Sequence, residues 1–107
     1  MLHADLASGK WNTLSLAEQL GNIGSEVGRA ARSREKDETK FRNAVTRALE
    51  LFDLTLADPR WRGRKTEIAR AREVFCDAVS GGSLYRSTLQ DMDRYFLSFA
   101  VAARRGR

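Results

Sequence analysis

The chain has 107 residues, 42% of them apolar, and a formal net charge of +5, which together indicate one globular domain with a single modest core. One cysteine, one histidine and one proline exclude a disulfide scaffold, a Cys/His zinc site and a collagen-like repeat. No stretch approaches the ~20 apolar residues that cross a bilayer, and the N-terminus lacks the basic and apolar regions of a signal peptide. We therefore expect a cytoplasmic protein that does not contact a membrane.

The first expected helix covers residues 15–34 and follows an N-terminal extension over residues 1–14. Ser15 and Glu18 have the spacing of a capping box, in which the two side chains satisfy free backbone N–H groups at the helix start. Beside the apolar face of this helix runs a stripe of small residues: Ala17, Gly21, Gly24 and Gly28. Each interior glycine costs up to ~1 kcal/mol relative to alanine. We expect the stripe to meet a helix of this chain or of a partner, unless tertiary packing merely rescues a weak helix.

The remaining helices are expected over residues 37–57, 63–79 and 88–104. Asp58 and Pro59 end the second, because proline disfavours α geometry in the residue before it. Gly81 and Gly82 end the third, and a second capping box, Ser87 to Gln90, begins the fourth.

Four helices of similar length with short connections predict an all-α protein, namely an antiparallel up-down four-helix bundle. Nowhere do β-branched or aromatic residues alternate over five or more positions, which argues against a sheet. The residues expected to face the core at the helix–helix contacts repeat at steps of three and four. They include Leu20, Ile23, Val27, Phe41, Ala44, Ala48, Phe52, Ile68, Phe75, Leu89, Met92, Tyr95, Phe96 and Phe99.

The usual catalytic and cofactor patterns are absent. His3 is the only histidine and precedes the first helix, which excludes histidine-dependent nucleophilic catalysis and the usual di-iron site. No phosphate-binding glycine loop occurs. Cys76 lies in an apolar run and is expected to be a small buried hydrophobe. We expect no enzyme, no cofactor and no metal, although Glu26, Glu50 or Asp53 would be the candidates for acid–base chemistry.

The basic residues are the most informative feature for function. Arginine outnumbers lysine 15 to 4, and the guanidinium group binds phosphate oxygens in two places. One cluster surrounds Trp61, whose ring is a candidate for stacking on an unpaired base. The expected nucleic-acid-binding residues are Arg60, Trp61, Arg62, Arg64, Lys65, Arg72, Arg104 and Arg105. A second cluster, residues 29–42, flanks the other end of the second helix, so the two clusters are expected at opposite ends of the molecule.

Three stretches carry a family resemblance over nearly the whole chain: WNTLSLAEQLGNIGSEVGRA, ALELFDLTLADPRWRGRKTEIARAREVFCD and YFLSFAVAARR. They resemble a family of small uncharacterised prokaryotic helical proteins. They are also similar to the superfamily of four-helix proteins encoded in 23S rRNA intervening sequences, which includes the accessory variability determinant (Avd) of diversity-generating retroelements. The resemblance implies a four-helix bundle that assembles into a basic ring and, for the retroelement member, binds a reverse transcriptase and its RNA. It implies no catalytic residue.

Two functions follow as alternatives. In the first, a non-enzymatic, homo-oligomeric helical bundle binds RNA, DNA or a nucleic-acid-processing protein through its basic residues. In the second, the protein is a protein–protein adaptor or structural oligomer, the stripe of Ala17, Gly21, Gly24 and Gly28 is its interface, and the charges only keep it in solution.

Overall fold

All regular structure is helical in the computed structural model, which describes residues 9–105 and holds no strand within that range. The elements, with η for a 3-10 helix, are η1 (Lys10–Thr13), α2 (Leu16–Ser33), α3 (Glu38–Ala57), η2 (Pro59–Arg64), α4 (Lys65–Val79) and α5 (Leu89–Arg105). The four expected helices are confirmed to within one or two residues at each end. The two 3-10 helices were not expected.

Side-chain caps begin three of the long helices. The predicted capping box of α2 is confirmed, because the Glu18 N–H donates to Ser15 Oγ at 3.1 Å and the Ser15 N–H donates to Glu18 Oε1 at 2.9 Å. At the start of α3, Asp37 accepts from the Lys40 N–H at 3.0 Å.

The box predicted at Ser87 and Gln90 lies one residue too early. Thr88 and Asp91 form it instead, with the Asp91 N–H donating to Thr88 Oγ1 at 3.0 Å and the Thr88 N–H donating to Asp91 Oδ2 at 3.1 Å. A carboxylate outcompetes an amide here because its charge strengthens the hydrogen bond and is favoured at a helix N-terminus. Hydrogen bonds from the Thr88 backbone and from Arg94 accordingly lower the pKa of Asp91.

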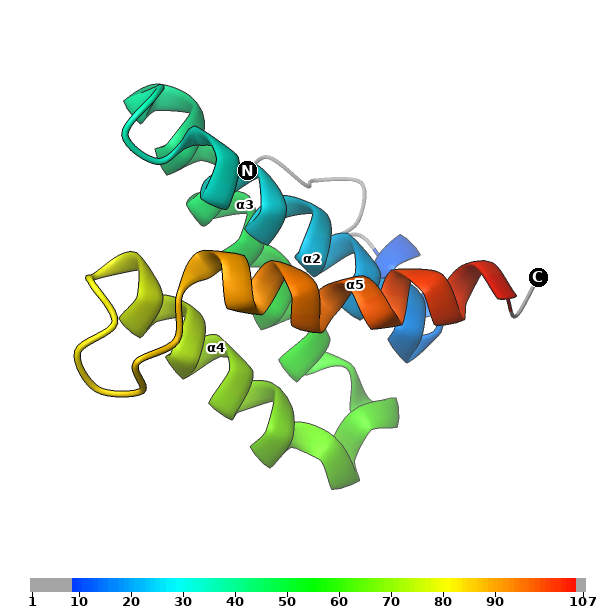
Figure 1. Ribbon diagram of the computed structural model, residues 1–107. Coiled ribbons are helices and arrows are strands. Elements are labelled where there is room, and N and C mark those ends of the chain that lie inside the picture. Colours follow the sequence, from blue (N-terminus) through cyan, green and yellow to red (C-terminus); the bar gives the residue numbers. More distant parts are fainter. Residues whose placement is uncertain (1–8, 106–107) are drawn as a thin grey trace.

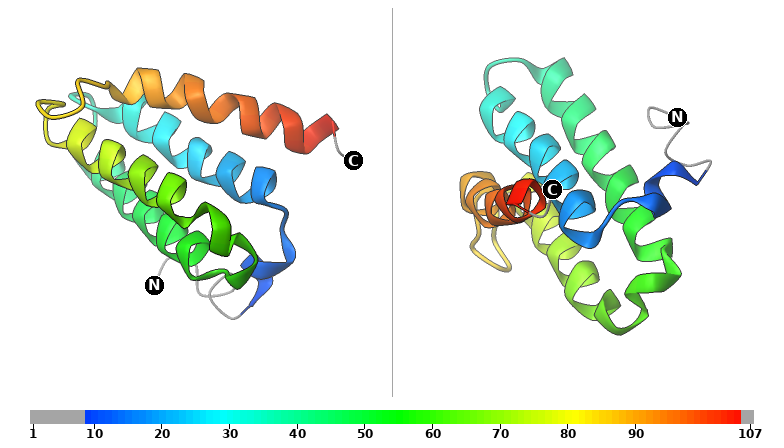
Figure 2. Two further views of the ribbon diagram at one scale, coloured as in Figure 1. Left: turned by 90° about the horizontal axis from the view of Figure 1, so that it is seen from below. Right: turned by 90° about the vertical axis from the view of Figure 1, so that its right-hand side faces the viewer.

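Helix α2 is central to the packing. It makes its most extensive contacts with α5 and then with α3, α3 packs on α4, and α4 and α5 touch at only a few points. Figures 1 and 2 show α5 lying along α2. A groove therefore remains between α4 and α5, lined by side chains that include Ala71, Val74, Met92 and Tyr95.

The core lies between α2, α3, α4 and α5 and contains most of the expected residues. Its buried apolar members are Trp11, Leu20, Ile23, Val27, Ala30, Ala44, Ala48, Leu51, Phe52, Ile68, Phe75, Ala78, Leu89, Met92 and Phe96. One expectation was wrong, because Tyr95 is 56% exposed and lines the open groove that the loose α4–α5 contact leaves. Trp11, in the N-terminal extension, was not among the expected core residues and is 1% exposed.

The helix ends are grouped in space. The start of α2, the end of α3, η2 with the start of α4, and the end of α5 gather at one end of the molecule (Figure 2). We call this the η2 end. Within residues 9–105, no helix combines the length and apolarity needed to span a bilayer.

Candidate functional site

A buried polar cluster holds the η2 end together. It consists of Trp11, Gln19, Thr55, Asp58, Arg60 and Trp61, which come from η1, α2, α3 and η2 and their junctions. Gln19, fully buried, donates from Nε2 to the Trp11 carbonyl at 2.9 Å and to Asp58 Oδ2 at 3.0 Å, and it accepts at Oε1 from Trp61 Nε1 at 2.9 Å. Trp11 Nε1 donates to Thr55 Oγ1 at 3.0 Å. Satisfied buried groups of this kind fix one geometry, because each alternative leaves a desolvated donor or acceptor.

Asp58 is the charged centre of this cluster and is 0% exposed. Its carboxylate accepts from the Arg60 backbone N–H at 3.0 Å and from Arg60 Nη2 at 2.7 Å, and Arg60 Nη2 also donates to the Leu14 carbonyl at 2.6 Å. The hydrogen bond from Arg60, assisted by Gln19, lowers the pKa of Asp58 from 3.8 to about 2 in spite of its burial. Asp58 also caps η2, and Pro59 follows at the first position, where its missing N–H costs nothing.

Acid should weaken the fold through Asp58. Because the pKa of Asp58 is lower in the folded chain, its contribution is fully present above pH ~4 and is lost as the pH falls through about 2. We expect Asp58 to account for roughly 2 kcal/mol of the stability that denaturant unfolding shows to be lost between pH 5 and pH 2. The Asp58→Asn variant, which lacks the titrating group, should lose correspondingly less over the same range. Equal pH dependence in the two proteins would contradict this assignment.

The structure gives three of the expected nucleic-acid-binding residues internal partners. Arg60 is bound to Asp58, and its guanidinium lies 4.4 Å from the Trp61 ring centroid. Trp61 is half-buried, donates to Gln19 and packs on the core, so it is not the free stacking platform that we expected. Arg72 Nε donates to Asp53 Oδ1 at 2.9 Å. Each of these side chains is occupied within the fold.

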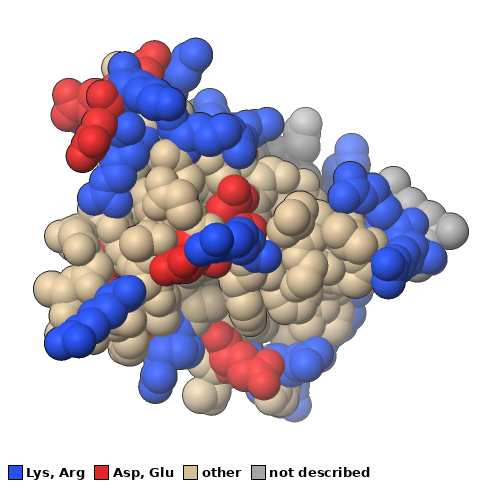
Figure 3. Space-filling view, in the orientation of Figure 1, with Lys and Arg blue, Asp and Glu red and all other residues tan. Residues whose placement is uncertain are grey.

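The other expected residues remain on the surface at the η2 end. Arg62, Lys65, Arg104 and Arg105 are exposed, and none has an ion pair within 4 Å inside residues 9–105. Arg64 reaches Glu67 Oε2 at 3.5 Å, but both side chains are exposed, and such pairs contribute little. In Figure 3, basic side chains gather at the end of α5 and again near η2 and α4, with uncharged surface between them on this face. The clusters thus share one end of the molecule without merging on this face.

The second basic cluster lies near the junction of α2 and α3, away from the η2 end. Arg34 donates from Nη1 to the Ala78 carbonyl and from Nη2 to the Val79 carbonyl, each at 2.8 Å. It therefore satisfies carbonyl groups at the C-terminus of α4, a position where a cation is also favoured by the helix dipole. Arg42 pairs with Glu38 at 2.7 Å.

Two of the three candidate carboxylates lie beside arginines. Glu26 is buried between Arg29 Nη1 at 3.0 Å and Arg47 Nη1 at 4.0 Å, and Asp53 is paired with Arg72. Glu50 Oε2 is buried without a hydrogen-bond donor, but no described cavity includes Glu26 or Glu50 among its lining residues. Within residues 9–105, no group of three or more potential ligands would hold a metal ion.

The chain matches no protein-family model, and no curated protein and no solved structure shows significant similarity to it.

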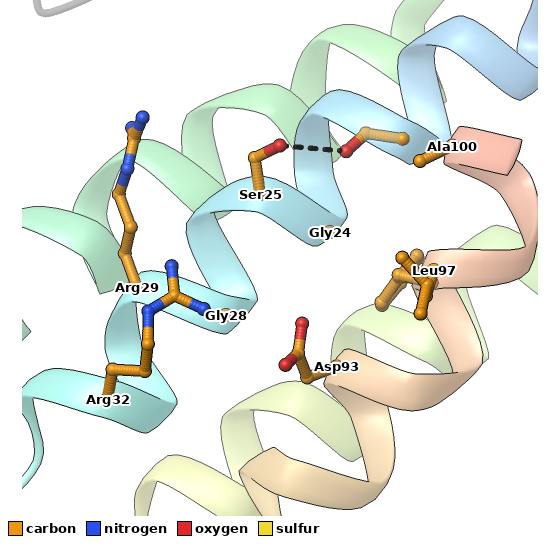
Figure 4. A pocket seen from close by; sticks show the side chains of 10 residues that line it. Gly24, Ser25, Gly28, Arg29, Arg32, Asp93, Leu97 and Ala100 are labelled. Atoms are coloured by element: carbon orange, nitrogen blue, oxygen red, sulfur yellow. Dashed lines mark hydrogen bonds between the residues drawn. The ribbon is translucent and has the colours of Figure 1, made fainter. Parts of the chain in front are cut away.

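The glycine stripe faces α5 of the same chain. A Cβ atom at Gly24 would lie 2.5 Å from Phe96 Cβ, and one at Gly21 would lie 3.2 Å from the Ala100 Cα. Figure 4 shows the solvent-facing edge of the contact between α2 and α5. This edge is a groove of about 260 Å³ whose lining includes Gly28, Ser25, Asp93 and Leu97. Ala17, the fourth member of the stripe, is half-buried. The stripe is thus an internal packing surface at Gly24, and only its edge is open to a partner.

Sequence reasoning missed Trp11, Gln19 and Asp58 as the residues that position η2. Gln19 gave no signal, because a polar residue beside an apolar stripe normally faces water. Asp58 did give one. An aspartate followed by proline is a helix N-cap signature. We interpreted the pair as the end of the preceding helix and left residues 58–65 open as a loop or the start of the next helix.

Proposed function

We propose that the protein is a non-enzymatic accessory protein that binds nucleic acid through the η2 end. The contact residues would be Arg62, Arg64, Lys65, Arg104 and Arg105. Arg60, Trp61 and Arg72 are left out of this set. Arg60 is bound to the buried Asp58, and Trp61 and Arg72 are half-buried and hydrogen-bonded to other side chains of the chain. RNA and DNA both present the phosphates that such a surface would bind.

The observation that carries this proposal is that exposed cations from two remote segments share one end of the molecule, and that only Arg64 among them has an ion pair within 4 Å in the described residues. The buried polar cluster anchors η2 beneath them, so part of the surface is preorganised before a ligand arrives. The grouping of the helix ends agrees with an antiparallel up-down bundle, which is part of the proposal. Its more specific form, with a reverse transcriptase and its RNA as partners, is what the resemblance to retroelement accessory proteins implies.

Removing Arg62 and Arg64 together should weaken nucleic-acid binding. The slope of log affinity against log salt concentration should become shallower by about one unit for every phosphate that the variant no longer binds. We would measure single-stranded RNA and DNA oligonucleotides by filter binding over a salt series, with the full chain and with Arg62→Ala/Arg64→Ala.

A matched control removes the same charge from the opposite end. Lys40→Ala/Arg42→Ala changes two exposed basic residues near the start of α3. It should leave the slope close to that of the unchanged protein. Equal reductions in the two double variants, or no reduction in either, would reject the η2 end as the binding surface.

The alternative function, a protein–protein adaptor, is favoured by a different surface from the one first expected. Gly24 is closed off by Phe96, whereas the groove between α4 and α5 leaves Tyr95 exposed. Val74→Glu would place a charge in this groove. Loss of a protein partner in this variant, with oligonucleotide binding unchanged, would favour the adaptor.

A further inference from the structure

We propose that the outer face of the α2–α5 contact binds a second copy of this chain about a two-fold axis. This inference does not depend on the proposed nucleic-acid binding. It starts from Leu97, whose side chain is 57% exposed on α5 and lines the open groove along α2. Leu97 is one of the four large apolar residues that are exposed within residues 9–105.

The residues on this edge of α5 form a pattern that is complementary to itself. Asp93, Leu97, Ala100 and Arg104 follow one another at steps of four, three and four, so they lie along one stripe of the helix. Two copies of α5 running in opposite directions, with the axis midway between Leu97 and Ala100, superimpose this spacing on itself. Asp93 then lies opposite Arg104 of the partner subunit, and Leu97 lies opposite Ala100 of the partner subunit. Each acidic side chain then lies opposite a basic one, and each large apolar side chain lies opposite a small one. Both pairs occur twice, as a two-fold interface requires.

The charges that this pairing would use are available. Neither Asp93 nor Arg104 has an ion pair within 4 Å in the described part of the chain. Figure 4 shows Asp93 directed from α5 towards Gly28 and Arg32 of α2. A Cβ atom added at Gly28 would lie 2.7 Å from Asp93 Oδ1 and 3.0 Å from Arg32 Nη1. Asp93 and Arg32 are therefore near one another, but they form no ion pair within 4 Å. Arg32 would thus add a second cation near the acidic end of the stripe.

On its α2 side, the groove beside Leu97 presents mostly small residues to a partner helix. Its walls come from Gly21, Gly24, Ser25 and Gly28 of α2, and it continues past Ala100 and Ala103 towards Arg104. Small side chains let two helices approach closely, so the α5 helix of a second copy can rest on the seam between α2 and α5. On reversal the spacing of the stripe is unchanged and each charge is replaced by its opposite, so the stripe is complementary to a second copy of itself. This symmetry is why the proposal commits to a second copy.

The test is the molar mass of the full chain, free of nucleic acid, measured by sedimentation equilibrium over a concentration series. We expect the mass to rise from 12.1 kDa towards twice that value. Leu97→Glu should hold the protein at the single-chain mass. Leu84→Glu is the matched control, because Leu84 is 80% exposed in the connection between α4 and α5 and lies outside the stripe. It should behave like the unchanged protein.

Charge reversal distinguishes loss of the interface from misfolding, because only a folded double variant can recover the dimer. Asp93→Arg alone and Arg104→Asp alone each place like charges opposite one another twice, and each should raise the dissociation constant of the dimer by more than about tenfold. Asp93→Arg/Arg104→Asp restores opposite charges in exchanged order and should recover the dimer. A single-chain mass at every concentration would overturn the proposal. So would any assembly, of two copies or more, that Leu97→Glu leaves intact.

Discussion

Asp58→Ala is expected to reduce the free energy of unfolding by about 2–3 kcal/mol, because it removes hydrogen bonds to a charged group and leaves a buried amide donor of Gln19 without one acceptor. The loss follows from what remains behind. Arg60, whose side chain is 40% exposed, keeps its charge without its carboxylate, and the fully buried Gln19 loses one of the two acceptors of its Nε2. Urea unfolding monitored by circular dichroism would measure the change. Asp58→Asn, which keeps the side-chain volume and one acceptor, should lose less and remains measurable if the alanine variant does not fold.

Asp53→Ala is the matched control for this prediction. Asp53 also pairs with an arginine, Arg72 at 2.9 Å, but its side chain is 62% exposed. We expect a loss below about 1 kcal/mol, because water replaces much of what an exposed pair provides. If both variants lose the same stability, the burial of Asp58 does not matter energetically, and the buried polar cluster is not what stabilises the η2 end.

Gly24→Ala is expected to destabilise the fold by about 1–3 kcal/mol, although alanine is the better helix former by up to ~1 kcal/mol. The added methyl group would lie 2.5 Å from Phe96 Cβ, an atom fixed to the α5 backbone, so the two helices must move apart. A chain of this size should then melt about 4–8 °C lower for each kcal/mol lost.

Gly28→Ala, one turn further along α2, separates helix propensity from packing. There the added methyl group would meet the Asp93 carboxylate and the Arg32 guanidinium, which are side-chain ends that can move aside. We expect a change between zero and a gain of ~1 kcal/mol. Changes of the same sign and size at both positions would show that the α2–α5 contact does not require the glycine at Gly24.

Local chemistry explains why the helices could be predicted. The Ser15–Glu18 capping box, the Asp58–Pro59 pair and the two glycines after α4 act over a few residues, so their signals are complete in the sequence. Gly81 and Gly82 indeed adopt positive φ values of 119° and 77° at the end of α4. Apolar residues at steps of three and four likewise predicted most of the core, because a helix that buries one face must repeat it at that period.

The candidate site could be predicted only in part, since exposure and partners depend on segments remote in sequence. The sequence of an arginine cluster is the same whether a guanidinium has no ion pair among the described residues, as at Arg62, or is bound to a buried carboxylate, as at Arg60. The sequence around Trp61 is likewise compatible with a ring that stacks on a base and with an indole N–H that donates to Gln19, 42 residues away. Nothing local distinguishes these cases.

The amino-acid order alone thus determined that this chain forms four amphipathic helices with a cationic excess, because propensity, capping and apolar periodicity act within one element. Tertiary structure decided the rest. It closed Gly24 against Phe96, turned Gln19 and Asp58 into a buried anchor for η2, and brought the basic start of α4 to the same end as the basic end of α5. The physical reason is that desolvation, steric contact and charge pairing depend on distances in space, which the packing of remote helices sets.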